Sequence, residues 1–399
     1  MSGAEVISLG CRLNLAEGEA MRAMLGRDDD LVVVNSCAVT AEAVATTLKA
    51  VRRARRDRPA ARILVTGCAA EIEPARFAGL AELVPNAAKL DRAAYHGGPG
   101  AGPAFAPLPE TKDHARAFLP VQTGCDHRCT FCIIPYGRGP SRSLPAGAVV
   151  EQVRGAVAAG RREVVLTGVD LTAYGADLPG RPSLAMLVER ILRLVPDLPR
   201  LRLSSLDPCE IDDRLVALFA DEPRLMPHLH LSLQAGCDLI LKRMKRRHSR
   251  AQAVALVARL KALRPEVAIG ADLIAGFPTE TEAMFAETAG LIEECDIVFA
   301  HVFPYSPRAG TPAARMPQVE REVARARAAR LREAGATRRQ AWLGVQIGRT
   351  ADVLVELDGT SGHAPDFAKV RLAAPLTPGA IARVRYAGVE GDTLVGAPA

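Results

Sequence analysis

Three cysteines, Cys125, Cys129 and Cys132, fall within eight residues of the stretch GCDHRCTFCIIPYGRG at 124–139. Clustered thiols are typical of metal sites, because thiolates bind zinc and also hold iron–sulfur clusters. A structural zinc site would need a fourth protein ligand, either His127 or a distant residue. A cubane cluster held by three thiolates would instead leave one iron open to an exogenous ligand. Three unrelated buried thiols are the remaining alternative.

Three further cysteines each follow a short apolar run with the length and β-branched content of a buried strand. Helix-like segments lie between the runs, and Thr40 is a plausible cap of the second helix. Parallel strands joined by helices end at one edge of a sheet, where open α/β sheets bind ligands. The cysteines could therefore converge into a second three-thiolate site, or act as small buried hydrophobes. The runs and cysteines are EVISLGC with Cys11, LVVVNSC with Cys37 and RILVTGC with Cys68.

A second alternating series predicts six βα units, which is fewer than the eight of a closed barrel. We therefore expect a partial (β/α)6 barrel with its chemistry at the carboxyl ends of the strands. A long basic helix follows at 319–344, and short strands and turns then predict a small all-β, OB-like barrel. The predicted central strands are RAFLPVQTG (116–124), REVVLTGVD (162–170), RLRLSSLD (200–207), HLHLSLQAG (228–236), EVAIGADLIAGFP (266–278) and DIVFAHVFPYS (296–306).

The predicted fold class is α/β, and the chain divides into four parts. These are an open parallel α/β sheet domain at 1–95, a Gly- and Pro-rich linker at 96–114, the partial barrel at 115–340 and the β-barrel at 341–399. The 399 residues are 49% hydrophobic, no run is long enough to span a membrane, and nine cysteines favour metal or redox chemistry over a disulfide framework. We expect a cytoplasmic protein, and its net charge of +6 permits an anionic partner.

The CxxxCxxC spacing, with an aromatic residue at Phe131, resembles the radical S-adenosylmethionine (SAM) superfamily. The resemblance implies that the open iron chelates SAM, and that reduction of the cluster cleaves SAM to methionine and a 5′-deoxyadenosyl radical. Residues at the ends of the predicted strands are then candidate SAM contacts, although Gly and Ser are also ordinary turn residues there. With Phe131, these candidates are Gly168, Asp170, Ser204, Ser205, Gln234 and Asp272.

Both cysteine trios and the terminal β-barrel together resemble the methylthiotransferases over essentially the whole chain. The resemblance implies two 4Fe–4S clusters, one supplying sulfur and one cleaving SAM, and a C-terminal TRAM domain that binds RNA. LGCRLNLAEGEAM and CDHRCTFCIIPYGRGPSRS are most like the MtaB branch, which acts on threonylcarbamoyladenosine beside the anticodon of tRNA. The alternatives are isopentenyladenosine in tRNA, an aspartate of a ribosomal protein, or a non-enzymatic zinc-dependent RNA-binding module.

As the resemblance implies, one SAM methylates a sulfide of the auxiliary cluster, and the radical from a second SAM removes hydrogen from adenine carbon 2. The methylthio group is then transferred there, and we identify no acid–base residue. The expected partners are the tRNA anticodon loop and a low-potential electron donor such as a flavodoxin or ferredoxin; we expect a monomer. The candidate RNA contacts are basic or aromatic, although basic runs are often only solvated helix faces. They are Lys245, Arg246, Arg247, Phe367, Lys369 and Arg371.

Overall fold

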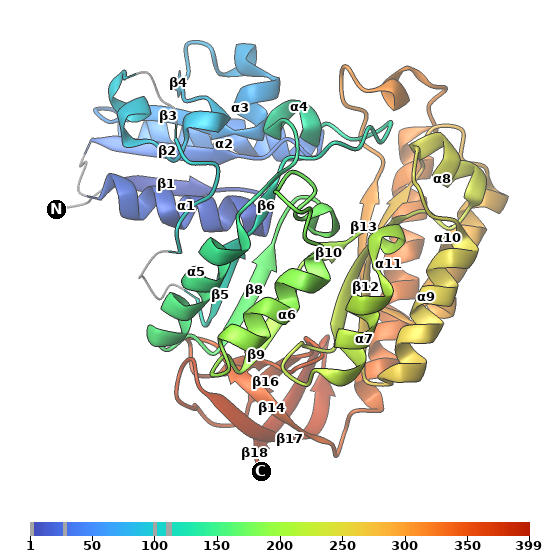
Figure 1. Cartoon of the computed structure of the whole chain (residues 1–399). Helices are drawn as coiled ribbons and strands as arrows, with labels where there is room; N and C mark the ends of the chain where they lie inside the picture. The colour runs from blue at the N-terminus through green and yellow to red at the C-terminus, as the bar shows by residue number, and fades with distance from the viewer. Residues whose placement is uncertain (1–3, 27–29, 99–101, 109–113) are drawn as a thin grey trace.

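The N-terminal region is built on a parallel sheet of strand order β1-β2-β3-β4, as Figure 1 shows in blue. The three predicted strands are confirmed, and their apolar side chains are buried on both faces of the sheet. β4 was not predicted, because two residues carry no periodicity. In this computed structural model, residues 4–26, 30–98, 102–108 and 114–399 are described. The strands are β1 (Glu5–Ser8), β2 (Leu31–Ser36), β3 (Arg62–Gly67) and β4 (Glu82–Leu83).

Each of the three predicted N-terminal strands leads directly into a cysteine and then toward a helix. Cys11 is the N-cap residue of α1, and Cys68 is the first residue of α3. Thr40 caps α2 as predicted, because its Oγ1 accepts a hydrogen bond of 3.1 Å from the N–H of Ala43. All three cysteines therefore stand at the carboxyl edge of the sheet. The helices are α1 (Arg12–Leu25), α2 (Ala41–Asp57) and α3 (Cys68–Ile72).

Parallel strands and outer helices form the central region, and they confirm the predicted partial barrel. The predicted strand RLRLSSLD is interrupted at Ser204, so that the six strands form two adjoining sheets. One sheet holds β5 (Arg116–Pro120), β8 (Glu163–Thr167) and β9 (Arg200–Leu203); the other holds β10 (Ser205–Leu206), β11 (His228–Gln234), β12 (Ala268–Ala275) and β13 (Ile297–Pro304). A separate pair consists of β6 (Gln122–Thr123) and β7 (Arg142–Ser143).

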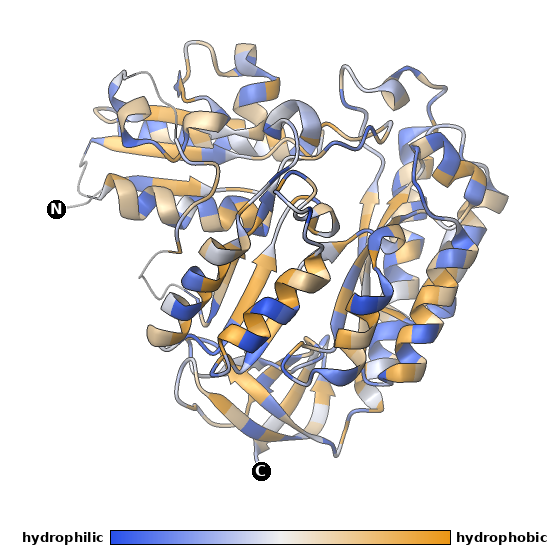
Figure 2. Ribbon diagram, in the orientation of Figure 1, coloured by the Kyte–Doolittle hydropathy of each residue, from blue (hydrophilic) through white to orange (hydrophobic). Residues whose placement is uncertain are grey.

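The two faces of the central strands differ in chemistry. Side chains at alternate positions, such as Leu119, Leu166 and Leu203, join one large apolar core beneath the outer helices. Figure 2 shows the strands as mainly hydrophobic and the helices as mixed. The intervening positions face the inside of the barrel and include charged residues such as Glu163 and Arg202. The helices are α5 (Ala146–Ala158), α6 (Leu184–Leu194), α7 (Asp213–Asp221), α8 (Asp238–Met244), α9 (Arg250–Leu263), α10 (Glu282–Glu294) and α11 (Arg321–Gly344), with α4 (Ile134–Arg138) in the cysteine loop.

The C-terminal region is a closed five-stranded barrel of order β14-β15-β16-β18-β17, as predicted apart from the short β15. Its strands are β14 (Thr350–Val355), β15 (Ser361–His363), β16 (Lys369–Leu372), β17 (Ile381–Glu390) and β18 (Thr393–Pro398). It lies at the bottom of Figure 1, against the amino ends of β5, β8 and β9. Of the predicted linker at 96–114, residues 99–101 and 109–113 lie outside the described residues. Among the described helices, none has the length and apolarity to cross a membrane.

A buried ion-pair network joins the N-terminal region to the cysteine loop of the central region. Arg138 of α4 donates hydrogen bonds of 2.9 and 3.0 Å to the two carboxylate oxygens of Glu17 and a further one to Asn14. Lys89 lies 2.5 Å from the same carboxylate. Although burial alone would raise it, the charges of Arg138 and Lys89 lower the pKa of Glu17 to about 2. The network fixes the two cysteine-bearing edges relative to each other.

Candidate functional site

The structure brings Cys11, Cys37 and Cys68 together at the carboxyl edge of the N-terminal sheet. Burial and the nearby thiols of Cys11 and Cys68 raise the pKa of Cys37. A Cβ on Gly10 would lie only 2.6 Å from the sulfur of Cys37, so the absence of a side chain there allows the sulfur to approach the backbone. Gly10 also has a φ of 95°, in the region that favours glycine. The convergence predicted from the three strand ends is therefore present.

Two residues that the sequence analysis did not single out hold these loops in place. The side-chain amide of Asn14 donates hydrogen bonds of 2.8 Å to the carbonyl of Leu9 and 2.9 Å to that of Ser36. The hydroxyl of Ser36 accepts hydrogen bonds from the backbone N–H groups of Ala69 and Ala70, at the start of α3. Asn14 and Ser36 thus tie the three cysteine-bearing turns to one another.

The loop of Cys125, Cys129 and Cys132 folds over the carboxyl ends of the central strands. The N–H of Cys125 donates to the carbonyl of Gly139 (3.2 Å), and that of Cys132 donates to the carbonyl of Cys129 (3.1 Å). Gly124 has a φ of 72°, and a side chain there would collide with the carbonyl of Pro140. The loop therefore closes on itself, with its three thiols on one short turn.

The two cysteine trios approach each other where α3 and α4 pack together. A Cβ on Gly137 would lie 3.2 Å from the Cβ of Cys68, so α4 contacts the third cysteine of the N-terminal trio. Burial, followed by the charges of Cys129 and Cys68, raises the pKa of Cys132 to about 12. A thiol of one trio therefore lies close enough to a thiol of the other to affect its pKa, and the two trios are neighbours in the fold.

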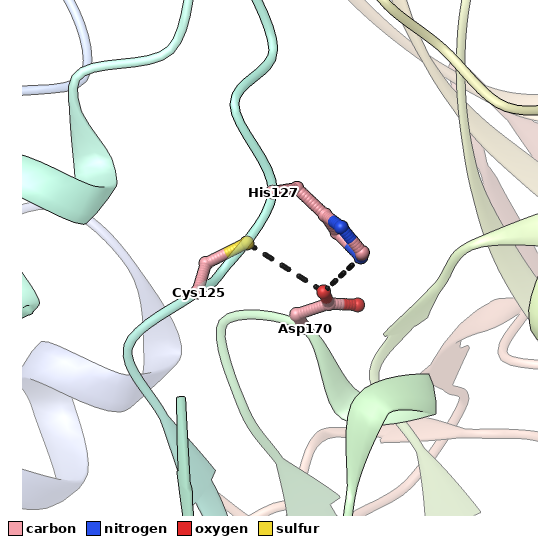
Figure 3. A group of neighbouring side chains, drawn as sticks. All are labelled: Cys125, His127 and Asp170. Atoms are coloured by element: carbon pink, nitrogen blue, oxygen red, sulfur yellow. Dashed lines mark hydrogen bonds and ion pairs between the residues drawn. The ribbon is translucent and has the colours of Figure 1, made fainter. Parts of the chain in front are cut away.

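Figure 3 shows Cys125 and His127 pointing toward the carboxylate of Asp170, which follows β8. The Nε2 of His127 lies 2.8 Å from Oδ2 of Asp170, and the sulfur of Cys125 lies 3.6 Å from the same oxygen. Hydrogen bonds to Asp170 and Glu210 raise the pKa of His127 to about 10. The Nε2 of His127 is thus engaged by the carboxylate of Asp170, and the ligand atoms of Cys125, His127 and Asp170 lie within 4.8 Å of one another.

The spacing of the thiols also distinguishes one zinc ion from a larger cluster. Zn–S bonds of about 2.3 Å in a tetrahedron place the sulfur atoms about 3.8 Å apart. In the described chain, the three sulfur atoms of neither trio all lie within 4.8 Å of one another. Neither trio is therefore gathered as the ligands of a single zinc ion would be, and three thiolates bound to different irons of a cubane would leave one iron open to an exogenous ligand.

Gln122 organises the predicted SAM-binding strand end, although the sequence analysis overlooked it. Its buried side-chain oxygen accepts hydrogen bonds from the N–H groups of Val169 (2.9 Å) and Asp170 (2.8 Å). Its NH2 group donates to the carbonyl of Gly124, beside Cys125. A Cβ on Gly168 would lie 2.9 Å from the same oxygen of Gln122. The chain thus places Gly168 and Asp170 beside the cysteine loop, and Gly168 is required for this close packing.

The remaining SAM candidates lie on the inner side of the central region. Ser204 sits at the break between β9 and β10 and has a buried hydroxyl without a hydrogen-bond partner among the described residues, and Ser205 is half-buried. Gln234 ends β11 with a φ of 70°. Phe131 packs edge-on against Phe277, with ring centroids 6.5 Å apart. Contact of these four residues with SAM stays a prediction.

Asp272 of β12 is already engaged by two histidines. Its Oδ1 lies 3.1 Å from Nε2 of His230 and 3.6 Å from Nδ1 of His301. These two partners hold the pKa of Asp272 well below its usual range, against the effect of burial. Contact of Asp272 with SAM stays a prediction.

Arg246 does not lie on the predicted RNA-binding surface. Its side chain is 7% exposed, because it donates hydrogen bonds to Asp207 (2.9 Å) and to the carbonyl of Ser232 (2.7 Å). Its Nη1 also lies 3.8 Å from the sulfur of Cys129. Arg246 is therefore part of the surroundings of the cysteine loop. Asp207, which the sequence analysis did not single out, is its anchor.

The other RNA candidates are distributed over distant parts of the molecule. Lys245 and Arg247 follow α8 and are exposed, but Arg247 is also paired with Glu210 (2.7 Å). Lys369 and Arg371 are exposed on β16, at the opposite end of the molecule in Figure 1. Phe367 is half-buried against the central region, where its ring lies 4.9 Å from that of His228. Phe367 is therefore not on an open stacking surface, because it closes the base of the central barrel.

Two family models match the chain in the regions that carry the cysteine trios. The model described as the radical SAM superfamily matches residues 119–292, and the model described as uncharacterized protein family UPF0004 matches residues 4–86. SAM and a 4Fe–4S cluster are the cofactors of the radical SAM superfamily, which confirms that prediction. The cysteines 11, 37 and 68 lie within the second matched region and the cysteines 125, 129 and 132 within the first.

Solved structures support the fold alone. The radical SAM methyltransferase TsrM from Kitasatospora setae superposes with a TM-score of 0.55 at 15% identity, covering 78% of this chain and 75% of that one. The cobalamin-dependent SAM radical enzyme OxsB gives a TM-score of 0.53 at 10% identity, covering 83% of this chain and 56% of that one.

Full-length relatives define the family more narrowly. Threonylcarbamoyladenosine tRNA methylthiotransferase MtaB of Rickettsia prowazekii (strain Madrid E) is 45% identical, over 97% of this chain and 95% of that protein. The tRNA-2-methylthio-N(6)-dimethylallyladenosine synthase of Erythrobacter litoralis (strain HTCC2594) is 37% identical, over 89% of this chain and 86% of that protein. With two neighbouring cysteine trios on a radical SAM fold and relatives of this identity and coverage, the chain belongs to the radical SAM methylthiotransferase family.

Proposed function

We propose that this enzyme transfers a methylthio group to carbon 2 of N6-threonylcarbamoyladenosine beside the anticodon of tRNA. The observation that carries the proposal is the approach of the two cysteine trios, because a substrate atom must meet both a radical and a sulfur donor. The similarity to MtaB of Rickettsia prowazekii supports the choice of threonylcarbamoyladenosine. The target base must be unstacked to enter, and loop bases of RNA are accessible in this way.

In this proposal Cys11, Cys37 and Cys68 hold one 4Fe–4S cluster, and the cysteines 125, 129 and 132 hold the other. When bound, the clusters supply the electron that cleaves SAM and the sulfur that is transferred. The chain itself positions both trios through Asn14, Gln122 and the Glu17–Arg138 pair. Arg246 places a positive charge beside the sulfur of Cys129, and such contacts to a ligand sulfur tune the potential of a cluster.

The proposal is tested by the tRNA nucleosides of a strain that lacks the gene. Mass spectrometry should show loss of 2-methylthio-N6-threonylcarbamoyladenosine and accumulation of its unmodified precursor, both reversed by complementation. Persistence of the methylthio nucleoside in a strain with no second methylthiotransferase gene would contradict it. Anaerobic reconstitution should give about eight irons per chain. Bound zinc without iron would favour the non-enzymatic RNA-binding module.

We also propose that the C-terminal barrel contacts the RNA through Lys369 and Arg371. Both are exposed on β16, and the one ion pair of Arg371 within the described residues is with the exposed Glu390. Both side chains can therefore turn to a phosphate without leaving a buried partner. The double change Lys369→Ala with Arg371→Ala should weaken binding of an anticodon stem-loop several-fold and lower the slope of log affinity against log salt by about 1 to 2. Fluorescence anisotropy over a salt series measures both quantities.

Lys245→Ala is the matched comparison, because Lys245 is exposed at the other end of the molecule. It should leave the salt slope unchanged if the barrel carries the contact. A reduced slope in Lys245→Ala and an unchanged one in the double variant would place the RNA on α8 instead.

A further inference from the structure

Three arginines surround the ring of Phe367 in the C-terminal barrel. One arginine comes from the N-terminal region and two come from the central region. The side chains of Arg12 and Arg116 lie 5.3 Å from the ring centroid of Phe367, and that of Arg202 lies 4.9 Å from it. Arg12 follows Cys11, and Arg116 and Arg202 come from β5 and β9. We name these three arginines the arginine cluster. It surrounds Phe367 at the base of the central barrel.

The carboxylates beside the arginine cluster are already engaged. Glu163 accepts from Nε of Arg202 (2.9 Å) and lies 3.6 Å from Arg200. Glu356 accepts from Arg116 (2.7 Å) and lies 2.8 Å from the ring nitrogen of His363. The half-buried Asp366, which precedes Phe367, accepts from the N–H of Ala368 (3.0 Å). With Arg200 counted, positive charge still exceeds negative charge around Phe367.

Hydrogen-bond donors of the arginine cluster also lack acceptors. Among the described residues, no hydrogen bond or ion pair of Arg12 is found; its guanidinium contacts only aromatic rings. Nε of Arg116 and Nη1 of Arg202 are buried without a hydrogen-bond partner in the described chain. Buried guanidinium donors without acceptors are costly, and a planar anion is the kind of group that accepts from several such N–H groups at once.

The position of Arg12 restricts which anion can reach it. Its backbone adjoins Cys11, so an acceptor for its guanidinium lies within one side-chain length of the N-terminal cysteine trio. In adenine, carbon 2 and the N6 substituent are only a few bonds apart. A base with carbon 2 at that trio therefore has its N6 substituent within reach of Arg12. A phosphate of the RNA backbone would have to enter the barrel with its neighbouring nucleotides, whereas one extruded base can enter alone.

We propose that the arginine cluster, with Arg12 as its unpaired member, binds the carboxylate of the N6-threonylcarbamoyl group and so selects this base over apolar N6 substituents. This inference rests on the proposed function. An isopentenyl group would leave Arg12, Nε of Arg116 and Nη1 of Arg202 without an acceptor. Sites built to hydrogen-bond a substrate group discriminate strongly against an analogue that lacks this group. Arg12 is a positioning and specificity residue in this proposal, since it holds the substituent and not the reacting carbon.

The test compares the reconstituted enzyme on three anticodon stem-loops. They carry threonylcarbamoyladenosine, its neutral carboxamide analogue, or isopentenyladenosine at the same position. For the wild type, kcat/KM for methylthio product should be roughly 10- to 100-fold higher on the acid than on the amide. Arg12→Gln should lose this preference by reducing turnover of the acid while leaving turnover of the amide within about threefold of the wild type. Arg12→Lys should retain part of the preference, since it keeps the charge.

Two controls separate recognition from damage. Arg193→Gln, an exposed arginine of α6 on the outside of the barrel, should leave both kcat/KM values unchanged. Iron content and SAM cleavage without RNA should be the same in Arg12→Gln and the wild type. Equal losses of Arg12→Gln on the acid and the amide would overturn the inference in favour of a phosphate contact or a purely structural role.

The remaining outcomes distinguish this inference from the proposed function. Wild-type turnover of the threonylcarbamoyl RNA without any preference for acid over amide would overturn the carboxylate site alone. Methylthio product formed only on the isopentenyl RNA, or on none of the three, would overturn the proposed function and the carboxylate site with it.

Discussion

Cys125→Ala is expected to abolish reductive cleavage of SAM and to lower the iron content from about eight to about four per chain. Cys125 begins the CxxxCxxC turn, and its sulfur lies beside Asp170 at the end of β8. With two thiolates left, the second trio cannot hold a cluster whose fourth iron is reserved for SAM. Production of 5′-deoxyadenosine under anaerobic reduction measures the first effect, and colorimetric iron analysis measures the second.

Cys37→Ala should separate the two sites. It removes a buried thiol of the N-terminal trio, so, if this trio holds the sulfur-donating cluster as proposed, sulfur transfer to the RNA should fall to background. Because Cys125, Cys129 and Cys132 are untouched, this variant should retain about four irons and some SAM cleavage. The pair of variants therefore assigns radical formation to one trio and sulfur donation to the other.

Cys295→Ala serves as the control with the same side-chain change. Cys295 is buried in the apolar core beside α10 and lies in neither trio. It should keep the wild-type iron content and product yield. Unchanged SAM cleavage in Cys125→Ala would overturn the assignment of the sites, and so would complete loss of both clusters in Cys37→Ala.

The larger architecture was predictable because it follows from periodicity. EVISLGC, LVVVNSC and RILVTGC have the length and β-branched content of buried strands, and each places a cysteine at the same sheet edge. The six central strands and the terminal β-barrel were predicted in the same way. The short strands β4 and β15 were missed, because two or three residues show no pattern.

The sequence pattern does not predict which way an individual side chain points in the folded protein. Lys245, Arg246 and Arg247 read as one basic run, yet Arg246 turns inward to Asp207 because α8 ends at Met244 and Lys245 adopts a φ of 57°. Phe367 reads as an exposed aromatic of an RNA-binding barrel. It is covered because that barrel docks on the central strands, and docking between regions leaves no local sequence pattern.

Docking of this kind also explains why the arginine cluster was not foreseen. Arg12, Arg116 and Arg202 are far apart in the sequence, and each alone resembles an ordinary surface arginine. Only the assembled chain places them around Phe367.

Glu163→Gln is expected to destabilise the folded chain by about 3–5 kcal/mol, because it leaves buried arginines without their main counter-charge. Glu163 is fully buried and binds Arg202 through both carboxylate oxygens, at 2.9 and 3.3 Å. Urea unfolding of the cluster-free, full-length chain at pH 7 measures the change in free energy. Glu189→Gln is the matched control in the same region, because Glu189 pairs with Arg214 at the surface and should cost less than about 1 kcal/mol.

The difference in unfolding free energy between wild type and Glu163→Gln should also depend on pH, in a direction that the pKa of Glu163 fixes. Burial raises the pKa of Glu163, but the charges of Arg202, Arg116 and Arg200 outweigh it and lower the pKa from 4.5 to about 2. A lowered pKa in the folded state stabilises the fold above the unfolded value, so the contribution is complete above about pH 4.5 and is lost as the pH falls toward 2. The difference in unfolding free energy between wild type and Glu163→Gln should therefore be constant from pH 7 to about 5 and shrink by pH 3. A constant difference down to pH 3, or one below 1 kcal/mol at pH 7, would show that Glu163 does not carry the charge that balances the arginine cluster.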